Sequence, residues 1–388
     1  MTLAPARSAP NSWAVPGMPR ARALAAACLM LVLAACSSVD RPKPTPLENY
    51  SSKIAGRQVW SVKLDKLRFP LVATARNGSF FVAGSDGAVL AIDAQSGREQ
   101  WRTSVGAPLT AGVGSDGRYT SVVTRDNEVV TLDGGKEIWR KRVPARVSTP
   151  PLVAGERVFV MGVDRVVIAF DALDGRRLWT LQRPGDALTL AQAGVVTSYK
   201  DLLLVGQGAR LTAVDPLKGS VRWEVSIGSP RGTNEVERLA DLVGPALRTG
   251  ETVCSRSFQL AVGCVDAERG GLVWARNSGG TNAIGGDAEL LFGADASDRI
   301  TAWRTPSGEV AWTSEKLLYR GLSAPMSAGR TVVFGDSEGQ LHFLSREDGQ
   351  TLLRLPTDGS AVVGTPVLSG TTMLVVTRDG GLFAFRPE

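Results

Sequence analysis

A short sequence motif that recurs seven times constrains the fold more than any other feature of this chain. One copy reads VLAIDAQSGREQW (residues 89–101) and another reads VVIAFDALDGRRLW (residues 166–179). Every copy has an apolar run and a polar turn, and all but one end in tryptophan; the exception ends in Leu353. A glycine stands four residues before each closing residue, at Gly97, Gly135, Gly175, Gly219, Gly270, Gly308 and Gly349.

The spacing of these copies predicts the architecture. The closing residues run from Trp60 to Leu353 in seven steps, so the mean period is about 42 residues, within the range of β-propeller blades. After Leu353 come three strand-like runs without a closing tryptophan, whereas Trp60 closes a run that has no blade before it. We predict an all-β, eight-bladed β-propeller whose last blade is closed by an N-terminal strand. A seven-bladed ring with an extra half-blade is the alternative.

The chemistry of the motif explains its repetition. An aspartate at the end of a strand can accept hydrogen bonds from the following amides, and the later glycine can adopt a positive φ, so the two form a turn. The closing tryptophan can then bury a large flat surface. Each copy is therefore expected to form one turn of a blade and the contact between that blade and its neighbour.

The N-terminal residues have the pattern of a bacterial export signal. After Met18, two arginines precede the apolar residues 23–35, a stretch too short to span a bilayer comfortably. It ends in Leu-Ala-Ala-Cys36, which resembles the lipobox of bacterial lipoproteins. We predict a signal peptide over residues 1–35, with Met18 as the true start, and lipid attachment at Cys36. An ordinary signal with a chance cysteine is the alternative.

Two segments follow the predicted signal. Residues 36–57 contain several prolines and serines without apolar periodicity, which predicts a lipidated flexible tether. Residues 58–388 are long enough to form the propeller as one domain. The formal net charge of the chain is +6, but no run of Lys and Arg is present. We therefore expect no nucleic-acid partner.

Cys254 and Cys264 stand at opposing positions of a predicted hairpin. Directly opposed strand positions can approach closely enough for a disulfide, and the periplasm is an oxidising compartment. The sequence leaves two interpretations of this pair open, a disulfide and two small buried thiols.

Little in the sequence points to catalysis. The segment from Gly335 to Gly339 matches G-x-S-x-G, but it lies between two strand-like runs and not at a strand-to-helix elbow. The only histidine, His342, is on the next strand and is expected to be half-buried packing. The sequence has no zinc-ligand spacing, haem-attachment motif or phosphate-binding loop. We therefore expect no catalytic, cofactor-binding or metal-binding residue.

The repeated A-x-D-x-x-x-G-x-x-x-W motif resembles the repeats of pyrroloquinoline-quinone enzymes, which are also eight-bladed propellers. A quinone-dependent dehydrogenase is accordingly one alternative function. Many of those enzymes have adjacent cysteines and a calcium site, whereas this sequence has no Cys-Cys pair and no carboxylate cluster apart from the turn aspartates.

The lipobox, the tether and the eight repeats together resemble the B-subunit lipoproteins of the outer-membrane β-barrel assembly machinery. This resemblance implies a non-catalytic scaffold of a Gram-negative bacterium. It would be lipid-anchored in the outer membrane, face the periplasm and assist insertion of β-barrel proteins. The implied partner is the central barrel-inserting subunit, bound through its periplasmic domains, and unfolded outer-membrane proteins are a further candidate. A propeller scaffold of another envelope complex is the alternative.

The same resemblance implies a binding site. The interval from Trp223 to Trp274 is longer than the mean, and the inserted sequence GTNEVERLADLVGP resembles an acidic E-x-x-R-L-x-D segment of the family. The matching residues are Glu237, Arg238, Leu239 and Asp241, and a neighbouring loop would contribute Leu188 and Leu190. The sequence departs from the family pattern at Ala191 and Val243.

Insertions in repeat proteins usually project from one face, often the binding face. Two simpler interpretations of these residues remain open. Leu188 and Leu190 alternate, so they could begin an inner strand and be core residues, and Asp241 could be a solvated loop acid.

Overall fold

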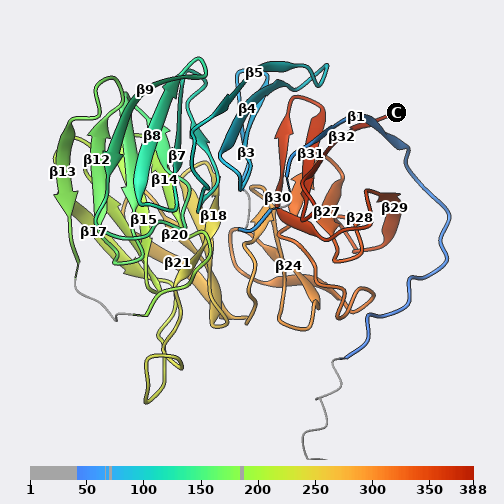
Figure 1. Cartoon of the computed structure of the whole chain (residues 1–388). Coiled ribbons are helices and arrows are strands. Elements are labelled where there is room, and N and C mark those ends of the chain that lie inside the picture. Colours follow the sequence, from blue (N-terminus) through green and yellow to red (C-terminus); the bar gives the residue numbers. More distant parts are fainter. Residues whose placement is uncertain (1–41, 66, 70–71, 184–187) are drawn as a thin grey trace, which may run out of the picture. The chain divides into compact units, whose positions relative to one another are not determined.

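The described chain is built of strands arranged as a ring. The structure, a computed structural model, describes residues 42–65, 67–69, 72–183 and 188–388, and residues 44–388 form one compact unit. In this unit eight four-stranded antiparallel sheets follow one another around the ring (Figure 1). The predicted all-β, eight-bladed β-propeller is confirmed. The predicted signal peptide and Cys36 lie outside the described residues.

In each blade the two middle strands are the most deeply buried, and in blade 1 the residues of the outer strand are exposed or half-buried. Blades 1 to 4 contain, from the inner to the outer strand, β2 (Thr74–Arg76), β3 (Ser79–Ala83), β4 (Ala88–Asp93) and β5 (Glu99–Ser104); β6 (Gly114–Ser115), β7 (Tyr119–Val123), β8 (Glu128–Asp133) and β9 (Lys136–Arg142); β10 (Leu152–Ala154), β11 (Arg157–Met161), β12 (Val167–Asp171) and β13 (Arg177–Leu181); β14 (Val196–Tyr199), β15 (Leu202–Gln207), β16 (Arg210–Val214) and β17 (Val221–Ser226).

Blades 5 to 7 have the same order, and blade 8 takes its outer strand from the N-terminal side. Their strands are β18 (Leu242–Thr249), β19 (Thr252–Ser257), β20 (Ala261–Asp266) and β21 (Gly271–Asn277); β22 (Gly285–Gly286), β23 (Leu290–Ala294), β24 (Ile300–Arg304) and β25 (Val310–Ser314); β26 (Met326–Ala328), β27 (Thr331–Gly335), β28 (Gln340–Ser345) and β29 (Thr351–Pro356); β30 (Val362–Ser369), β31 (Thr372–Thr377), β32 (Gly381–Pro387) and β1 (Gly56–Lys63).

Blade 8 closes the ring in the predicted way. β1 pairs antiparallel with β32, from Gly56 opposite Pro387 to Lys63 opposite Gly381. Because the two ends of the propeller are strands of one sheet, the ring cannot open without breaking this ladder.

Each closing tryptophan packs against the motif glycine of the next blade. Trp139 of blade 2 covers Gly175 of blade 3, which has a φ of +69°, and the indole Nε1 donates to the carbonyl of Ala172 at 2.8 Å. A Cβ atom at any of the seven glycines would lie 2.4–2.8 Å from the nearest ring atom, so only glycine fits. The other contacts are Trp60–Gly97, Trp101–Gly135, Trp179–Gly219, Trp223–Gly270, Trp274–Gly308 and Trp312–Gly349.

A small residue faces each of these tryptophans across the outer strand pair. The cross-strand pairs are Ala91–Trp101, Thr131–Trp139, Ala169–Trp179, Ala213–Trp223, Cys264–Trp274, Ala302–Trp312 and Ala384–Trp60. In blade 7 the pair is Phe343–Leu353, with the large residue on the other strand. The contact between blades 7 and 8 is therefore built differently from the other seven.

Blade 5 contains the two opposed cysteines. Cys254 of β19 and Cys264 of β20 are paired residues of the ladder, and the structure joins them by a disulfide. Both side chains are fully buried and belong to an apolar cluster with Trp274 and Trp303.

Part of the predicted tether contacts the propeller. Residues 44–55, here called the strap, lie against β29, the outer strand of blade 7. The amide of Lys53 donates to the carbonyl of Leu352 at 2.9 Å, and the hydroxyl of Tyr50 accepts from the amide of Arg354 at 2.7 Å. The Arg354 guanidinium also lies 5.0 Å from the centre of the Tyr50 ring.

The beginning of the strap is held at the connection between blades 6 and 7. The carboxylate of Glu48 accepts from the hydroxyl of Thr351 at 2.7 Å and pairs with Lys316 at 3.1 Å. The hydrogen bond from Thr351 contributes most to holding the pKa of Glu48 below its usual value. The amide of Thr45 donates to the carbonyl of Leu318 at 3.0 Å. The strap thus bonds to the outer strand of blade 7 and to the connection that precedes this blade.

A buried charged group closes the β27–β28 hairpin of blade 7. Asp336 accepts from Arg320 Nε at 2.8 Å and is bonded to His342 Nε2 at 2.9 Å. Arg320 also donates to the carbonyl of Thr45 in the strap at 3.1 Å. The prediction that His342 is half-buried was wrong, because its side chain is fully buried. The G-x-S-x-G segment around Ser337 is a hairpin turn between strands, as expected.

The environment shifts the pKa values of this pair. Burial lowers the pKa of His342 below 6.5, against the opposing effect of the Asp336 hydrogen bond. Burial by itself would raise the pKa of Asp336, but the hydrogen bonds from His342 and from the Gln340 amide hold it below its usual value. The imidazole is therefore neutral in the folded protein at neutral pH, and the carboxylate is charged.

We predict that Trp139→Leu lowers the free energy of unfolding by about 2–4 kcal/mol, because the smaller side chain leaves a cavity over Gly175. Leu173→Ser is the matched control. Leu173 lies in the turn that contains Gly175, but its side chain is 66% exposed. Its replacement should therefore change the free energy of unfolding by no more than about 0.5 kcal/mol. Denaturant unfolding followed by tryptophan fluorescence measures both. Equal effects of the two changes would contradict the role of the indole contact.

We also predict that the single imidazole titrates in NMR spectra with a midpoint below 6.5. Because the folded state disfavours the protonated form, the unfolded state binds more protons below pH 6.5, and stability falls as the pH decreases through that value. Replacement by glutamine should remove this part of the pH dependence. A midpoint at or above 6.5 would show that burial does not dominate the environment of His342.

Candidate partner-binding site

Two connections between blades contain the predicted site. Residues 182–195 join β13 to β14, and residues 227–241 join β17 to β18. Both run from the outer strand of one blade to the inner strand of the next, so they lie on the same face of the ring. The second connection is the insertion predicted from the repeat spacing, and it projects beyond the ends of the strands (Figure 1).

Local hydrogen bonds give the insertion its shape. The side chain of Asn234 accepts from the amide of Glu237 at 2.9 Å, and the carbonyl of Asn234 accepts from the amide of Arg238 at 3.2 Å. The Glu237 carboxylate turns back and accepts from the amide of Thr233 at 2.7 Å. The two side chains thus hold this segment as a turn, much as a capping box holds the first turn of a helix. The same amide bond contributes most to holding the pKa of Glu237 below its usual value.

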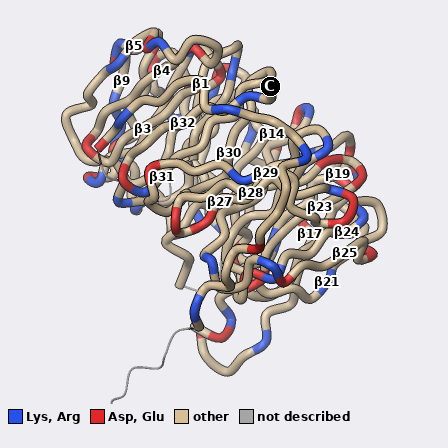
Figure 2. Tube along the Cα trace, turned by 90° about the vertical axis from the view of Figure 1, so that its right-hand side faces the viewer, with Lys and Arg blue, Asp and Glu red and all other residues tan. Residues whose placement is uncertain are grey.

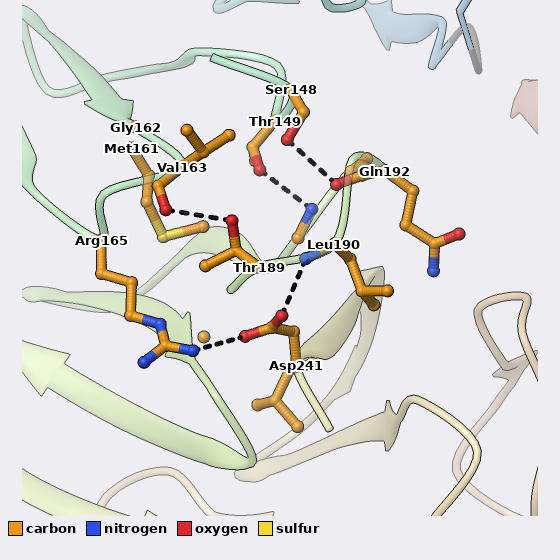
Figure 3. Close-up of a pocket in the computed structure, with 14 residues that line it drawn as sticks. Ser148, Thr149, Met161, Gly162, Val163, Arg165, Thr189, Leu190, Gln192 and Asp241 are labelled. Atoms are coloured by element: carbon orange, nitrogen blue, oxygen red, sulfur yellow. Dashed lines mark hydrogen bonds and ion pairs between the residues drawn. The ribbon is translucent and has the colours of Figure 1, made fainter. Parts of the chain in front are cut away.

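Asp241 joins the two connections to each other and to blade 3. One carboxylate oxygen accepts from the amide of Leu190 at 2.9 Å, and the other lies 3.4 Å from a guanidinium nitrogen of Arg165 (Figure 3). The Asp241 side chain is only 15% exposed. Arg165 stands in the β11–β12 hairpin with a φ of +63°, and its carbonyl accepts from the side chain of Gln207 at 2.7 Å.

Further bonds hold the first connection across several blades. The hydroxyl of Thr189 donates to the carbonyl of Val163 at 3.0 Å, and the amide of Gly194 donates to the hydroxyl of Thr149 at 2.9 Å (Figure 3). The side chain of Gln192 donates to the carbonyl of Thr281, just before blade 6, at 3.0 Å. The cleft among these residues has a volume of about 40 Å³, which leaves room for water molecules but not for a substrate.

The structure separates the roles of the predicted residues. Leu188 is 37% exposed, whereas Leu190 packs against a small buried cluster that includes Val243. Neither leucine belongs to a strand, since β14 begins at Val196. Asp241 is a bonded, largely buried acid and not a solvated one. Leu188 is thus available for contact, while Leu190 and Asp241 position the loop.

The remaining predicted residues line two clefts beside the insertion. Leu239 lies in a cleft of about 880 Å³ with Leu260 and Phe258. Arg238 lines another of about 480 Å³, in which Glu224 pairs with Arg210 at 2.7 Å. Along the described trace, positions of Lys and Arg are interspersed with positions of Asp and Glu (Figure 2).

Two residues that the sequence did not single out belong to this site. Val236, near the tip of the insertion, is 71% exposed. Its position between Glu235 and Glu237 in an inserted loop could have indicated that this apolar side chain is exposed. Arg165 is the partner of Asp241, but it lies 76 residues away in the sequence, and no local pattern connects the two.

The described ranges show neither a metal-ligand cluster nor a membrane-spanning helix. Among residues 42–388, apart from the three short gaps, no three His, Cys, Asp or Glu side chains gather as metal ligands. The same residues include no helix that is both long and apolar enough to cross a bilayer.

The sequence matches proteins of one family over nearly its whole length. A family model described as outer membrane protein assembly factor BamB matches residues 51–109, 85–314 and 316–388. The chain is 37% identical to the outer membrane protein assembly factor BamB of Burkholderia pseudomallei over 371 residues, which cover 94% of this chain and 97% of the relative. Identity to the protein of the same name from Bordetella pertussis is 35% over 365 residues, with coverages of 92% and 95%.

Solved structures share the fold. The crystal structure of BamB from Moraxella catarrhalis has a TM-score of 0.78 at 21% identity and covers 86% of this chain and 100% of its own. A quinohemoprotein alcohol dehydrogenase from Pseudomonas putida has a TM-score of 0.65 at 14% identity, with coverages of 85% and 76%. At these identities the similarity concerns the fold alone. The dehydrogenase alternative therefore has fold-level support only.

We predict that Asp241→Ala frees the loop around Leu190. A hydrogen bond to a charged acceptor contributes about 1.5–3 kcal/mol, so the Leu190 amide should exchange with deuterium about tenfold faster or more. Hydrogen-exchange mass spectrometry of peptides covering residues 188–194 measures this. Glu237→Gln is the control, because that carboxylate caps only its own turn. Unchanged exchange in Asp241→Ala would mean that the other anchors hold the loop without it.

Proposed function

The chain belongs to the BamB family of outer membrane protein assembly factors, and on this premise we propose that it is a non-catalytic scaffold of the β-barrel assembly machinery. In this proposal it binds the central barrel-inserting subunit through the periplasmic domains of that subunit. It thereby assists the insertion of β-barrel proteins. The match over nearly the whole chain supports the role as a whole.

The main structural support for the proposed site is the link between the β13–β14 and β17–β18 connections. Asp241 bonds to the Leu190 amide and to Arg165, so two loops from different blades form one pre-organised surface. Leu188 and Val236 present apolar side chains there. We propose that they are the anchors of the contact. Anchors of this kind contribute most when polar residues surround them and exclude water.

Glu237, Arg238 and Leu239 supply the surroundings of these anchors in the proposed contact. The Glu237 carboxylate keeps the insertion folded and Arg238 adds positive charge to the cleft around Glu224. Leu239 extends the apolar surface toward Phe258.

We also propose a lipid at Cys36 that anchors the protein to the inner leaflet of the outer membrane, facing the periplasm. The sequence before Cys36 supports this proposal. Several acyl chains on one residue would hold the protein stably at the membrane. Unfolded outer-membrane proteins are a further candidate partner of the propeller.

A pull-down from detergent-solubilised envelopes tests the function and the site together. Wild type should retain the barrel-inserting subunit, and Leu188→Glu combined with Val236→Glu should reduce retention about tenfold or more, since each buried anchor typically contributes about 2 kcal/mol. Leu217→Glu is the control, because Leu217 is 62% exposed on a turn of blade 4 outside the two connections. Asp241 is left intact, so the surface stays folded.

Each outcome is informative. Retention by wild type and the control, and loss by the double variant, supports both the function and the site. Retention by all three keeps the function and rejects the site. If wild type does not retain the subunit, a scaffold role in another envelope complex gains support. In the same cells, Cys36→Ser should move the protein from the membrane fraction to the soluble periplasm if the lipid anchor is present.

A further inference from the structure

The contact between blades 7 and 8 lacks the tryptophan that closes the other contacts. Leu353 takes its place, and the facing position holds Phe343 where the other blades have Ala, Thr or Cys. Blade 8 also lacks the motif turn between its third and fourth strands, because β32 and β1 come from the two ends of the propeller. Gly56 stands there instead, and a Cβ on it would lie 3.3 Å from the Leu353 side chain.

A cavity remains at this place. Its volume is about 630 Å³, within the range of pockets that hold small organic molecules. The walls come from both blades, and their side chains are mainly apolar: Phe343, Leu353, Leu355, Met373 and Phe385. At the mouth, Ile54 of the strap is 37% exposed and Leu368 is 45% exposed. Phe343 and Leu353, in place of a small residue and an indole, thus line an open apolar pocket between two packed blades.

Two arginines and one glutamate stand at the rim of the pocket. Arg330 is exposed at the β26–β27 hairpin, and no acceptor among the described residues is bonded to its guanidinium. Arg386 donates to the hydroxyl of Thr372 at 2.8 Å. The acidic rim residue, Glu388, is paired with Arg57 at 3.8 Å. Arg330 is therefore the rim charge that is free to meet an anion.

We propose that this pocket binds a monomeric amphipathic molecule of the fatty-acid class, with one aliphatic chain and an anionic head group. The chain would lie among Leu353, Met373 and Phe385, and the head group would meet Arg330. Leucine and methionine side chains adapt readily to a flexible chain, and burying each methylene group favours binding. The site is separate from the two connections that carry the proposed partner contact, so it does not depend on the proposed function.

The repeat itself supplies the variant that tests the pocket. Phe343→Ala combined with Leu353→Trp gives blade 7 the small-residue and tryptophan pair found in the other blades, and the indole should fill the cavity. Titration calorimetry with sodium dodecanoate below its micelle concentration measures binding. We expect wild type to bind and the double variant to lose about tenfold or more in affinity, because several methylene groups lose their contacts.

The head group has its own test. Arg330→Gln should weaken dodecanoate binding about two- to fivefold, which is the range for an exposed ion pair, and should leave binding of uncharged dodecanol unchanged. Equal weakening of both probes would overturn the assignment of the head group to Arg330. Absence of dodecanoate and dodecanol binding by wild type would overturn the pocket itself.

Two further measurements keep the proposal falsifiable. The midpoint temperature of thermal unfolding of the double variant should be no lower than that of wild type. If the double variant does not fold, Leu368→Arg takes its place. This change blocks only the mouth of the pocket and should also abolish binding. Undiminished binding by a folded blocking variant overturns the proposal. Binding to phosphatidylglycerol vesicles without binding of monomeric dodecanoate also overturns it, because a membrane surface would then be the ligand.

Discussion

The indole ring of one blade lying on the glycine of the next is the contact on which the whole ring depends. The ladder hydrogen bonds of a propeller blade run within its own sheet, so its contact with the neighbouring blade depends mainly on side chains. The glycine can adopt the positive φ of the turn and leaves room for the ring, while a small cross-strand residue such as Ala169 leaves room on the other side. The same tryptophan–glycine contact recurs seven times around the ring, and the last of these joins blade 8 to blade 1 through Trp60 and Gly97.

Much of this architecture could be predicted from the sequence because its determinants are local. The glycine and tryptophan of each motif lie four residues apart, and the period of the motif gives the number of blades. The unpaired strand around Trp60 indicates the closure. The full burial of His342 could not be predicted from local sequence. Its burial depends on Arg320 and Asp336, which the fold brings together from a connection and a hairpin.

The candidate site was less accessible to sequence reasoning. Asp241 acts through the Leu190 amide and through Arg165, at sequence separations of 51 and 76 residues. Those contacts exist only after three blades have packed side by side. The sequence could identify the insertion because it interrupts the repeat, but it could not separate residues that position the surface from residues that are exposed on it. Leu188 and Leu190 have the same chemistry, and only burial distinguishes them.

The strap shortens the segment that separates Cys36 from the propeller. Twenty free residues from Cys36 to Ala55 could extend about 70 Å, whereas the eight residues before Pro44 reach at most about 29 Å. Thr45 is bonded in the connection from blade 6 to blade 7, which lies on the same face as the connections with Leu188 and Val236. With a lipid at Cys36, as proposed, the segment before Pro44 would therefore keep the propeller close to the bilayer. The propeller would then diffuse along the membrane, at a small distance from any partner embedded in it. This confinement raises the effective concentration of the propeller at the partner without any additional contact.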